Sequence, residues 1–266
     1  MIMNKKIGMI AALAVFGFGM LNANEIIKIE KSGDLSKSSK VSRQGNLLIV
    51  KGSADLFSAK TIKLDPNKKY RLTGDFRLQS GSPVQVFLGY VAQDSNGKTI
   101  FPLYVNPVSG STTEIAATVR RGSKVITVKD ASAWNKKFAA CYIAFNVKDD
   151  FSDLPNRSVI QIEKNGIKQV GDVWEITLKQ PLKMNMMEGT KVRQHINGAT
   201  YIWNTGFATL KNQWITRRGV LTGIAKTGNP PNKLWPGTKY VKLIIRVNGK
   251  ADSVTEMRSI KVEEVK

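Results

Sequence analysis

The chain has 266 residues and a formal net charge of +21, with 41 Lys and Arg against 20 Asp and Glu. A single Cys, Cys141, excludes an intramolecular disulfide, and a single His, His195, excludes a multi-His metal site. The cationic excess favours polyanionic partners such as sulfated or uronic polysaccharide, anionic cell-surface polymer or nucleic acid, although solubility alone is an alternative reason for it.

Residues 1–23 have the pattern of a signal peptide. Lys5 and Lys6 form a basic start, the uncharged apolar run Ile7–Leu21 follows, and cleavage is predicted after Ala23. The apolar run is short for a transmembrane helix, so no stable membrane insertion is expected, and an uncleaved anchor is the alternative. We therefore expect a secreted or periplasmic protein, for which nucleic acid is not expected to be the partner in vivo.

The segment that follows, residues 24–45, is expected to be flexible. Glu25–Glu30 has the composition of a short first strand, but residues 31–44 are rich in Ser and Lys and contain few apolar side chains. The structured part of the chain is therefore expected to begin at about residue 46.

Residues 60–78 carry the clearest strand pattern. Ile62 and Leu64 alternate with polar residues before the turn sequence Asp65-Pro66-Asn67-Lys68. After the turn, every second residue is apolar or Gly, at Tyr70, Leu72, Gly74, Phe76 and Leu78. This pattern predicts two antiparallel strands, each with an apolar face that a second sheet must cover.

Alternation continues along the rest of the chain. Residues 83–105 predict a hairpin around the turn at 94–97, about five short strands are expected between Val125 and Val192, and Tyr240–Val247 and Ser259–Glu263 are strands. No segment has a convincing helical period. The sequence therefore predicts an all-β fold, a jelly-roll β-sandwich over residues 46–266, with residues 106–200 as a β-rich insertion or subdomain.

Two groups of motifs resemble the galactose-binding-like jelly roll of bacterial carbohydrate-binding modules. The first contains Leu47-Leu-Ile-Val50, Ile62-Lys-Leu-Asp-Pro66 and Tyr70-Arg-Leu-Thr-Gly-Asp-Phe76, and the second contains Trp214-Ile-Thr-Arg-Arg-Gly-Val220, Pro236-Gly-Thr-Lys-Tyr-Val-Lys-Leu243 and Ser259-Ile-Lys-Val-Glu-Glu264. A further segment, Gly122-Ser-Lys-Val-Ile-Thr-Val-Lys-Asp-Ala-Ser-Ala-Trp134, is similar to jelly-roll domains of phage tail and neck proteins. The first resemblance implies a sugar-binding sandwich.

The resemblance also bears on metal binding. Many such modules have an acidic residue directly before the last Ile-x-Val strand, where it helps to hold a structural calcium. Arg258 and Ser259 stand there in this chain, so oxygen ligands would have to come from elsewhere, such as Asp252 or Glu256. We expect no metal site and no cofactor, with a structural calcium on such oxygen ligands as the alternative.

Aromatic and basic residues near predicted turns are the candidates for ligand binding. Sugar C–H faces stack on aromatic rings, and acidic groups pair with Arg. The candidate residues are Trp134, Trp203, Trp214, Trp235, Arg120, Arg121, Arg217 and Arg218. Trp235 and Trp134 are expected to be the most exposed of the Trp side chains, and Trp174 is assigned to the core.

We expect a protein without catalytic residues that binds acidic polysaccharide or a cell-surface glycan. One alternative is a structural or assembly protein of an envelope or virion-like surface. A second is a polysaccharide lyase that uses Arg193-Gln194-His195 with Tyr201, where strand alternation places Arg193 and His195 on one face and Gln194 on the other. The sequence contains no P-loop and no Gly-x-Ser-x-Gly elbow, and it leaves the oligomeric state open.

Overall fold

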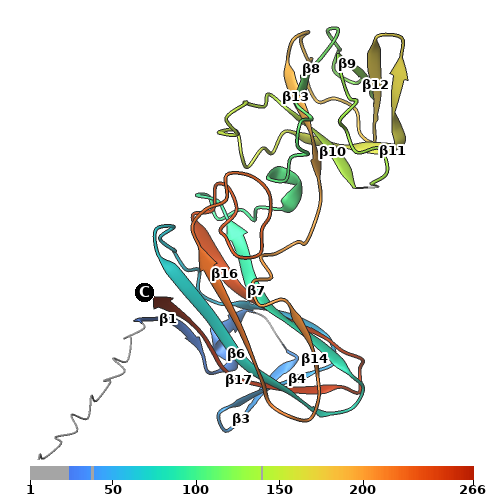
Figure 1. Ribbon diagram of the computed structural model, residues 1–266. Coiled ribbons are helices and arrows are strands. Elements are labelled where there is room, and N and C mark those ends of the chain that lie inside the picture. The colour runs from blue at the N-terminus through green and yellow to red at the C-terminus, as the bar shows by residue number, and fades with distance from the viewer. Residues whose placement is uncertain (1–23, 37–38, 139) are drawn as a thin grey trace, which may run out of the picture.

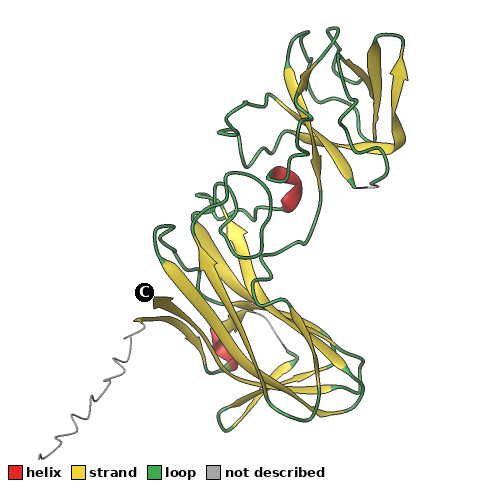
Figure 2. Ribbon diagram, in the orientation of Figure 1, coloured by secondary structure: helices red, strands yellow, loops and turns green. Residues whose placement is uncertain are grey.

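The computed structural model describes residues 24–36, 39–138 and 140–266 (Figure 1). The predicted signal peptide, residues 1–23, lies outside the described residues. Within the described part the regular elements are strands and two short 3-10 helices, η1 (Ser32–Asp34) and η2 (Pro102–Tyr104), so the all-β prediction is confirmed (Figure 2). None of the helices described here has the length and apolar character needed to cross a membrane.

A two-sheet sandwich forms the larger unit (Figure 1). Sheet A has the order β15-β6-β17-β4-β3, with β1 also paired to β17, and sheet B has the order β14-β7-β16-β5-β2. The strands are β1 (Asn24–Ile29), β2 (Leu35–Ser36), β3 (Val41–Gln44), β4 (Leu47–Lys51), β5 (Ala54–Ser58), β6 (Lys69–Ser80), β7 (Val84–Gln93), β14 (Phe207–Leu210), β15 (Ile215–Thr222), β16 (Tyr240–Asn248) and β17 (Val254–Val265). From β4 to β7 and from β14 to β17, successive strands alternate between the sheets, which agrees with the predicted jelly-roll sandwich.

The core of the sandwich consists of the inward side chains of both sheets. Leu72 and Phe76 of β6 meet Leu88 and Tyr90 of β7 and Leu243 of β16, and all are buried. Outward side chains are therefore free of core packing, and they decide what the two faces can bind.

The N-terminal segment is not a flexible tail in the described residues. β1 pairs with the end of β17, with Ile29 opposite Ile260, and β3 pairs with β4. Ile29 is buried in the sandwich core. The prediction of flexibility over residues 24–45 is therefore wrong for these strands, because the edges of sheet A supply backbone partners that the polar composition does not reveal.

Residues 60–78 form a turn but not a hairpin. Asp65 accepts hydrogen bonds from the backbone N–H groups of Asn67 and Lys68, as the turn sequence predicts. Ile62 then bridges to Val241 in sheet B, whereas β6 lies in sheet A. The predicted antiparallel pair is wrong because the chain crosses from one sheet to the other at this turn.

Residues 83–105 also differ from the predicted hairpin. The turn at Asp94–Gly97 is present, and Thr99 and Ile100 return alongside β7. The chain then enters η2, and the neighbours of β7 in the sheet are β16 and β14. Pro102 ends the returning strand, since proline cannot donate to a ladder.

The smaller unit is a barrel inserted between β7 and β14. Its strands are β8 (Thr113–Glu114), β9 (Val125–Val128), β10 (Cys141–Phe145), β11 (Val159–Val170), β12 (Val173–Leu178) and β13 (Lys191–Ile196), in the order β8-β13-β10-β11-β12-β9. A bridge between Ile115 and Val128 brings the two ends of this order together. The barrel has its own core, which includes Phe145, Ile176 and Trp134. The segment from Gly122 to Trp134 that resembles phage domains lies here, outside the sandwich.

Loops hold the barrel against one end of the sandwich. Arg157 bonds the carboxylate of Asp94 at 2.7 Å, and the backbone N–H of Asn156 donates to the carbonyl of Tyr104 at 2.9 Å. At Gly237 an added Cβ would lie 2.3 Å from Cδ of Pro155, so only glycine permits this approach. The two units are therefore joined by specific contacts as well as by the chain itself.

Candidate functional site

The outer face of sheet B carries a group of aromatic side chains that do not belong to the core. Phe57 of β5, Phe87 of β7 and Phe207 of β14 stand on the outward positions of their strands, and Tyr201 and Trp203 precede β14. Phe207 is 59% exposed and the other four are partly exposed. We call these five residues the aromatic face.

The rings of the aromatic face touch one another in a continuous series. Phe57 meets Tyr201 with ring centroids 6.1 Å apart, and Tyr201 meets Trp203 at 5.4 Å in a nearly perpendicular arrangement. Phe87 then lies 5.4 Å from Trp203 and 5.6 Å from Phe207. The series spans the sheet from β5 to β14, so it forms an extended apolar platform.

Backbone pairing to β7 holds the two central rings in place. Ile202 and Tyr90 exchange both backbone hydrogen bonds, each at 2.9 Å, and the side chain of Ile202 is buried in the core. Neighbouring side chains of a strand point to opposite faces, so Tyr201 and Trp203 point outward. Gly89 makes this contact possible, because a Cβ there would lie 2.2 Å from the Ile202 carbonyl oxygen.

One ion pair lies beside these rings. Arg246 donates to both carboxylate oxygens of Asp55 at 2.7 Å, and its guanidinium lies 5.4 Å from the Trp203 ring centroid and 5.8 Å from that of Tyr201. The hydrogen bond to Asp55 raises the pKa of Arg246, and burial raises the pKa of the Tyr201 hydroxyl. A hollow of about 320 Å³ adjoins the pair. The platform therefore offers a neutral phenol, a paired guanidinium and a recess for polar groups.

Two of the predicted Trp residues are buried. Trp235 is 0% exposed and lies in the sandwich core, and Trp134 is 3% exposed in the barrel core, where its Nε1 donates to the Ser111 carbonyl at 2.9 Å. The expectation that these are the most exposed Trp side chains is wrong. Both follow loop-like sequence, but the loops fold inward over the cores. Trp174, assigned to the core, packs against the barrel core while partly exposed.

The remaining predicted residues are scattered over the molecule. Trp203 is part of the aromatic face, whereas Trp214 lies beside sheet A under the guanidinium of Arg258, 4.1 Å from its ring centroid. Arg217 donates to the carbonyl of Thr205, and Arg218 is exposed on β15. Arg120 and Arg121 are exposed on the barrel. The structure therefore does not bring the eight predicted residues into one site.

Sequence reasoning missed most of the aromatic face. The predicted aromatic site residues were Trp side chains near turns, so the Phe residues at outward strand positions were not included. The useful signal was the alternation in β7, where Phe87 stands among Gln85 and Gly89 on the side opposite Val86 and Leu88. An aromatic side chain on the polar side of a strand is an exposed apolar group that the core does not explain.

The residues considered for lyase chemistry are buried in the barrel. Arg193, Gln194 and His195 are at most 1% exposed, and Tyr201 lies away from them on the sandwich. Arg193 and His195 share one side of β13, as alternation predicts, and Arg193 Nε donates to His195 Nε2 at 3.0 Å. Because a substrate cannot reach these groups in the folded barrel, they do not form a candidate catalytic site.

Burial makes His195 a source of acid sensitivity. Its Nδ1–H donates to the Leu103 carbonyl at 2.8 Å, and burial lowers its pKa to about 4. Since the unfolded imidazole has a pKa of about 6.5, the unfolded chain takes up the proton first. The free energy of unfolding should therefore fall as pH drops from about 6.5 to about 4, by up to about 3 kcal/mol. Urea unfolding of the wild type and of His195→Asn across this range measures it; equal pH slopes would contradict the assignment.

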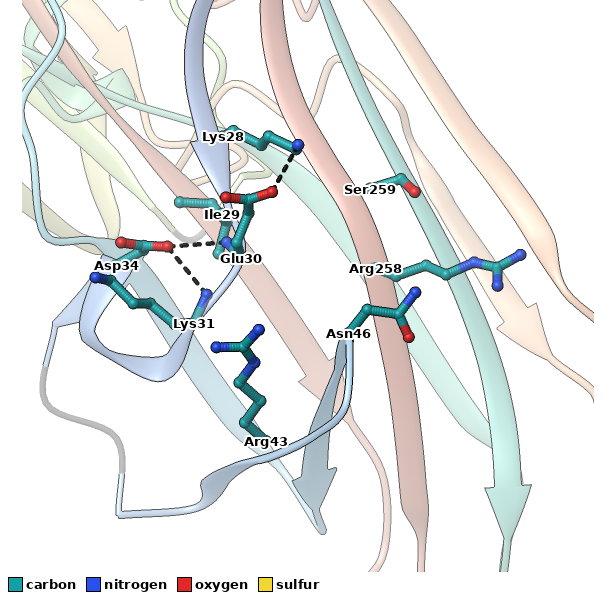
Figure 3. Close-up of a pocket in the computed structure, with 9 residues that line it drawn as sticks. All are labelled: Lys28, Ile29, Glu30, Lys31, Asp34, Arg43, Asn46, Arg258 and Ser259. Atoms are coloured by element: carbon teal, nitrogen blue, oxygen red, sulfur yellow. Dashed lines mark hydrogen bonds and ion pairs between the residues drawn. The ribbon is translucent and has the colours of Figure 1, made fainter.

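A polar pocket of about 500 Å³ lies where β17 passes from its partner β4 to its partner β1 (Figure 3). Lys28 pairs with Glu30 at 2.6 Å, and Asp34 accepts from the backbone N–H groups of Glu30 and Lys31. Figure 3 shows these groups directed toward one another. The pocket has no aromatic lining and its carboxylates are engaged internally, so the aromatic face remains the better candidate for a binding site.

The two carboxylates considered for calcium have protein partners. Glu256 accepts from Arg77, and Asp252 accepts from the backbone N–H and hydroxyl of Ser82 at 3.0 and 2.9 Å. In the part of the chain that the structure describes, no group of three or more His, Cys, Asp and Glu residues is placed to hold a metal ion.

No protein-family model and no curated protein matches the chain. Among solved structures, one described as "CBM4 structure and function" has 7% identity and a TM-score of 0.32, covering 93% of this chain and 81% of its own. The CBM22-1 xylan-binding domain from Paenibacillus barcinonensis Xyn10C has 9% identity and a TM-score of 0.32, covering 92% and 93%.

Proposed function

We propose that the protein binds carbohydrate through the aromatic face. The observation that carries this proposal is the uninterrupted series of five rings, from Phe57 to Phe207, outside the sandwich core. Pyranose rings present apolar C–H faces that stack on such rings, while a folded chain gains little from leaving them in water. An extended series suits several consecutive sugar units of a polysaccharide.

Polar side chains border the platform and supply hydroxyl partners. Gln85 of β7 stands opposite Thr209 of β14 on one side and Asn248 of β16 on the other, in the row next to Phe87. All three are at least partly exposed. Amide and hydroxyl groups can both donate to and accept from sugar hydroxyls. This row gives the site a means of orienting a sugar that stacks on the rings.

The charge distribution supports a division of roles. Within the face, Asp55 neutralises Arg246, so the stacking site itself does not require an anionic sugar. The formal charge of +21 acts over the whole chain and should attract acidic polysaccharide at a distance. We therefore assign ring recognition to the aromatic face and the preference for acidic or cell-surface glycans to long-range attraction.

Binding to immobilised polysaccharides at low and high salt tests both roles. The panel should include neutral glucans and xylans beside alginate, pectin and heparin. Binding to at least one polysaccharide should survive high salt, because stacking is not screened, and acidic polymers should gain additional affinity at low salt. Loss of all binding at high salt would contradict the role of the aromatic face.

A further inference from the structure

A two-stranded ribbon on the barrel joins the β8–β9 connection to the β12–β13 connection. Val119 and Met186 exchange both backbone hydrogen bonds, and Gly122 donates to the Leu182 carbonyl. His195, near the C-terminal end of β13, bonds the Leu103 carbonyl in η2, whereas Lys191 lies at the N-terminal end of β13. The ribbon begins beside Lys191, where the Ile115 N–H donates to the Thr190 carbonyl, and it ends beside the C-terminus of β12, where the Leu178 N–H donates to the Lys124 carbonyl. We call residues 118–124 and 182–188 the distal ribbon.

The distal ribbon exposes apolar and cationic side chains together. Met184 and Met187 are 57% and 63% exposed, among the most exposed of the large hydrophobic residues described. Four exposed cations belong to the same ribbon, namely Arg120, Arg121, Lys124 and Lys183, against one carboxylate, Glu188. Met186, between the two exposed methionines, points into the barrel core. The outward methionines therefore have no packing role in the barrel.

The cations of the distal ribbon are not neutralised by the protein. None of the four forms an ion pair or a side-chain hydrogen bond with any described residue. On sheet A the opposite holds, where Arg71 pairs with Glu263 and Arg77 with Glu256. Uncompensated charge on an exposed ribbon produces a local positive potential that favours an anionic surface.

We propose that the distal ribbon docks on an anionic lipid surface. Lipid phosphates would pair with Arg120, Arg121, Lys124 and Lys183, and Met184 and Met187 would enter the interfacial layer. Cations combined with flexible apolar side chains match a bilayer surface, which offers negative charge and an apolar layer beneath it. A soluble polyanion uses the cations alone and gives the methionines no partner. The binding is peripheral and leaves the aromatic face, on the sandwich, open.

Vesicle co-sedimentation of the full chain tests the charge component. The lipids are phosphatidylcholine alone and phosphatidylcholine mixed with phosphatidylglycerol. The variant is Arg120→Ser with Arg121→Ser, and the matched control is Lys63→Ser with Lys69→Ser, which removes the same charge from exposed, unpaired positions on the sandwich. The ribbon variant should lose on the order of 10- to 30-fold in partition to anionic vesicles, and the control should lose much less. Equal losses would overturn the proposal in favour of general attraction.

A second variant separates lipid from soluble polyanion. Met184→Ser with Met187→Ser keeps every charge and leaves the buried Met186 unchanged. It should lower partition to anionic vesicles, most clearly at high salt, and should leave heparin binding as in the wild type. Unchanged vesicle partition would overturn lipid docking and assign the ribbon to a soluble polyanion. Thermal unfolding of each variant verifies that the barrel is intact.

Discussion

Replacing Trp203 with Ala should weaken polysaccharide binding on the order of 10- to 100-fold, because central aromatic contacts dominate binding free energies. Trp203 lies in the middle of the ring series, between Tyr201 and Phe87, and its loss divides the platform into two separate parts. Its side chain is outside the sandwich core, so the fold should persist. Isothermal titration calorimetry with an oligosaccharide selected on the polysaccharide panel measures the change.

Trp214→Ala is the matched control for this effect. Trp214 is also partly exposed, but it lies beside sheet A with Arg258 and Arg77 against its ring. Removing it should leave the affinity within about 2-fold, since non-contact surface substitutions have small effects. If Trp214→Ala abolished binding and Trp203→Ala did not, the site would be on sheet A.

Asp153→Ala should destabilise the barrel by about 3–5 kcal/mol, the usual cost of removing one partner from a buried ion pair. The Arg193 guanidinium is 2.6 Å from the Asp153 carboxylate, and their side chains are 1% and 7% exposed. Asp153 also accepts from the Asn156 amide at 2.9 Å and from the backbone N–H of Lys148 at 3.1 Å. Without Asp153, Arg193 would stay buried and charged with no carboxylate.

Urea unfolding monitored by far-UV circular dichroism measures this loss. The control is Asp149→Ala, whose pair with Lys191 is exposed at both ends and should contribute less than about 1 kcal/mol. Burial alone would raise the pKa of Asp153, but hydrogen bonds from Asn156 and Lys148 and the charge of Arg193 lower it overall. The stability that Asp153 contributes should therefore be present at neutral pH and lost in acid. Equal effects of the two variants would show that the buried network is not important for stability.

The sequence predicts the fold class well because each sandwich strand has one buried face and one face toward solvent, which produces alternating apolar and polar residues. The alternation in β6 and β16 predicts strands and a covering sheet, and the five strands expected between Val125 and Val192 are all present. The pairing partner of each strand is less predictable. The turn at Asp65–Lys68 forms, yet its two flanks belong to different sheets, because turn chemistry sets chain reversal but not the sheet that each flank joins.

The candidate site is predictable only in part. Trp203 was selected, but Phe57 and Tyr201 become neighbours only because residues 201–203 pair with β7 across more than a hundred intervening residues. Trp235 shows the converse problem. Its Pro- and Gly-rich surroundings are typical of an exposed loop, yet the ring is buried in the core and its Nε1 donates to the Pro230 carbonyl at 3.3 Å. Local composition predicts where the chain turns, but it does not predict whether a side chain near the turn is buried.

The position of the barrel within the chain sets the order in which the two units can fold. All barrel strands lie between residues 113 and 196, whereas β17 pairs with β6 across a sequence separation of 192 residues at Arg71 and Glu263. Pairing between strands that are far apart in sequence has a larger entropic cost of loop closure, so it forms slowly. The barrel should therefore be complete while sheet A still lacks its central strand. In that interval β4 and β6 present open edges, and aggregation competes with the docking of β17.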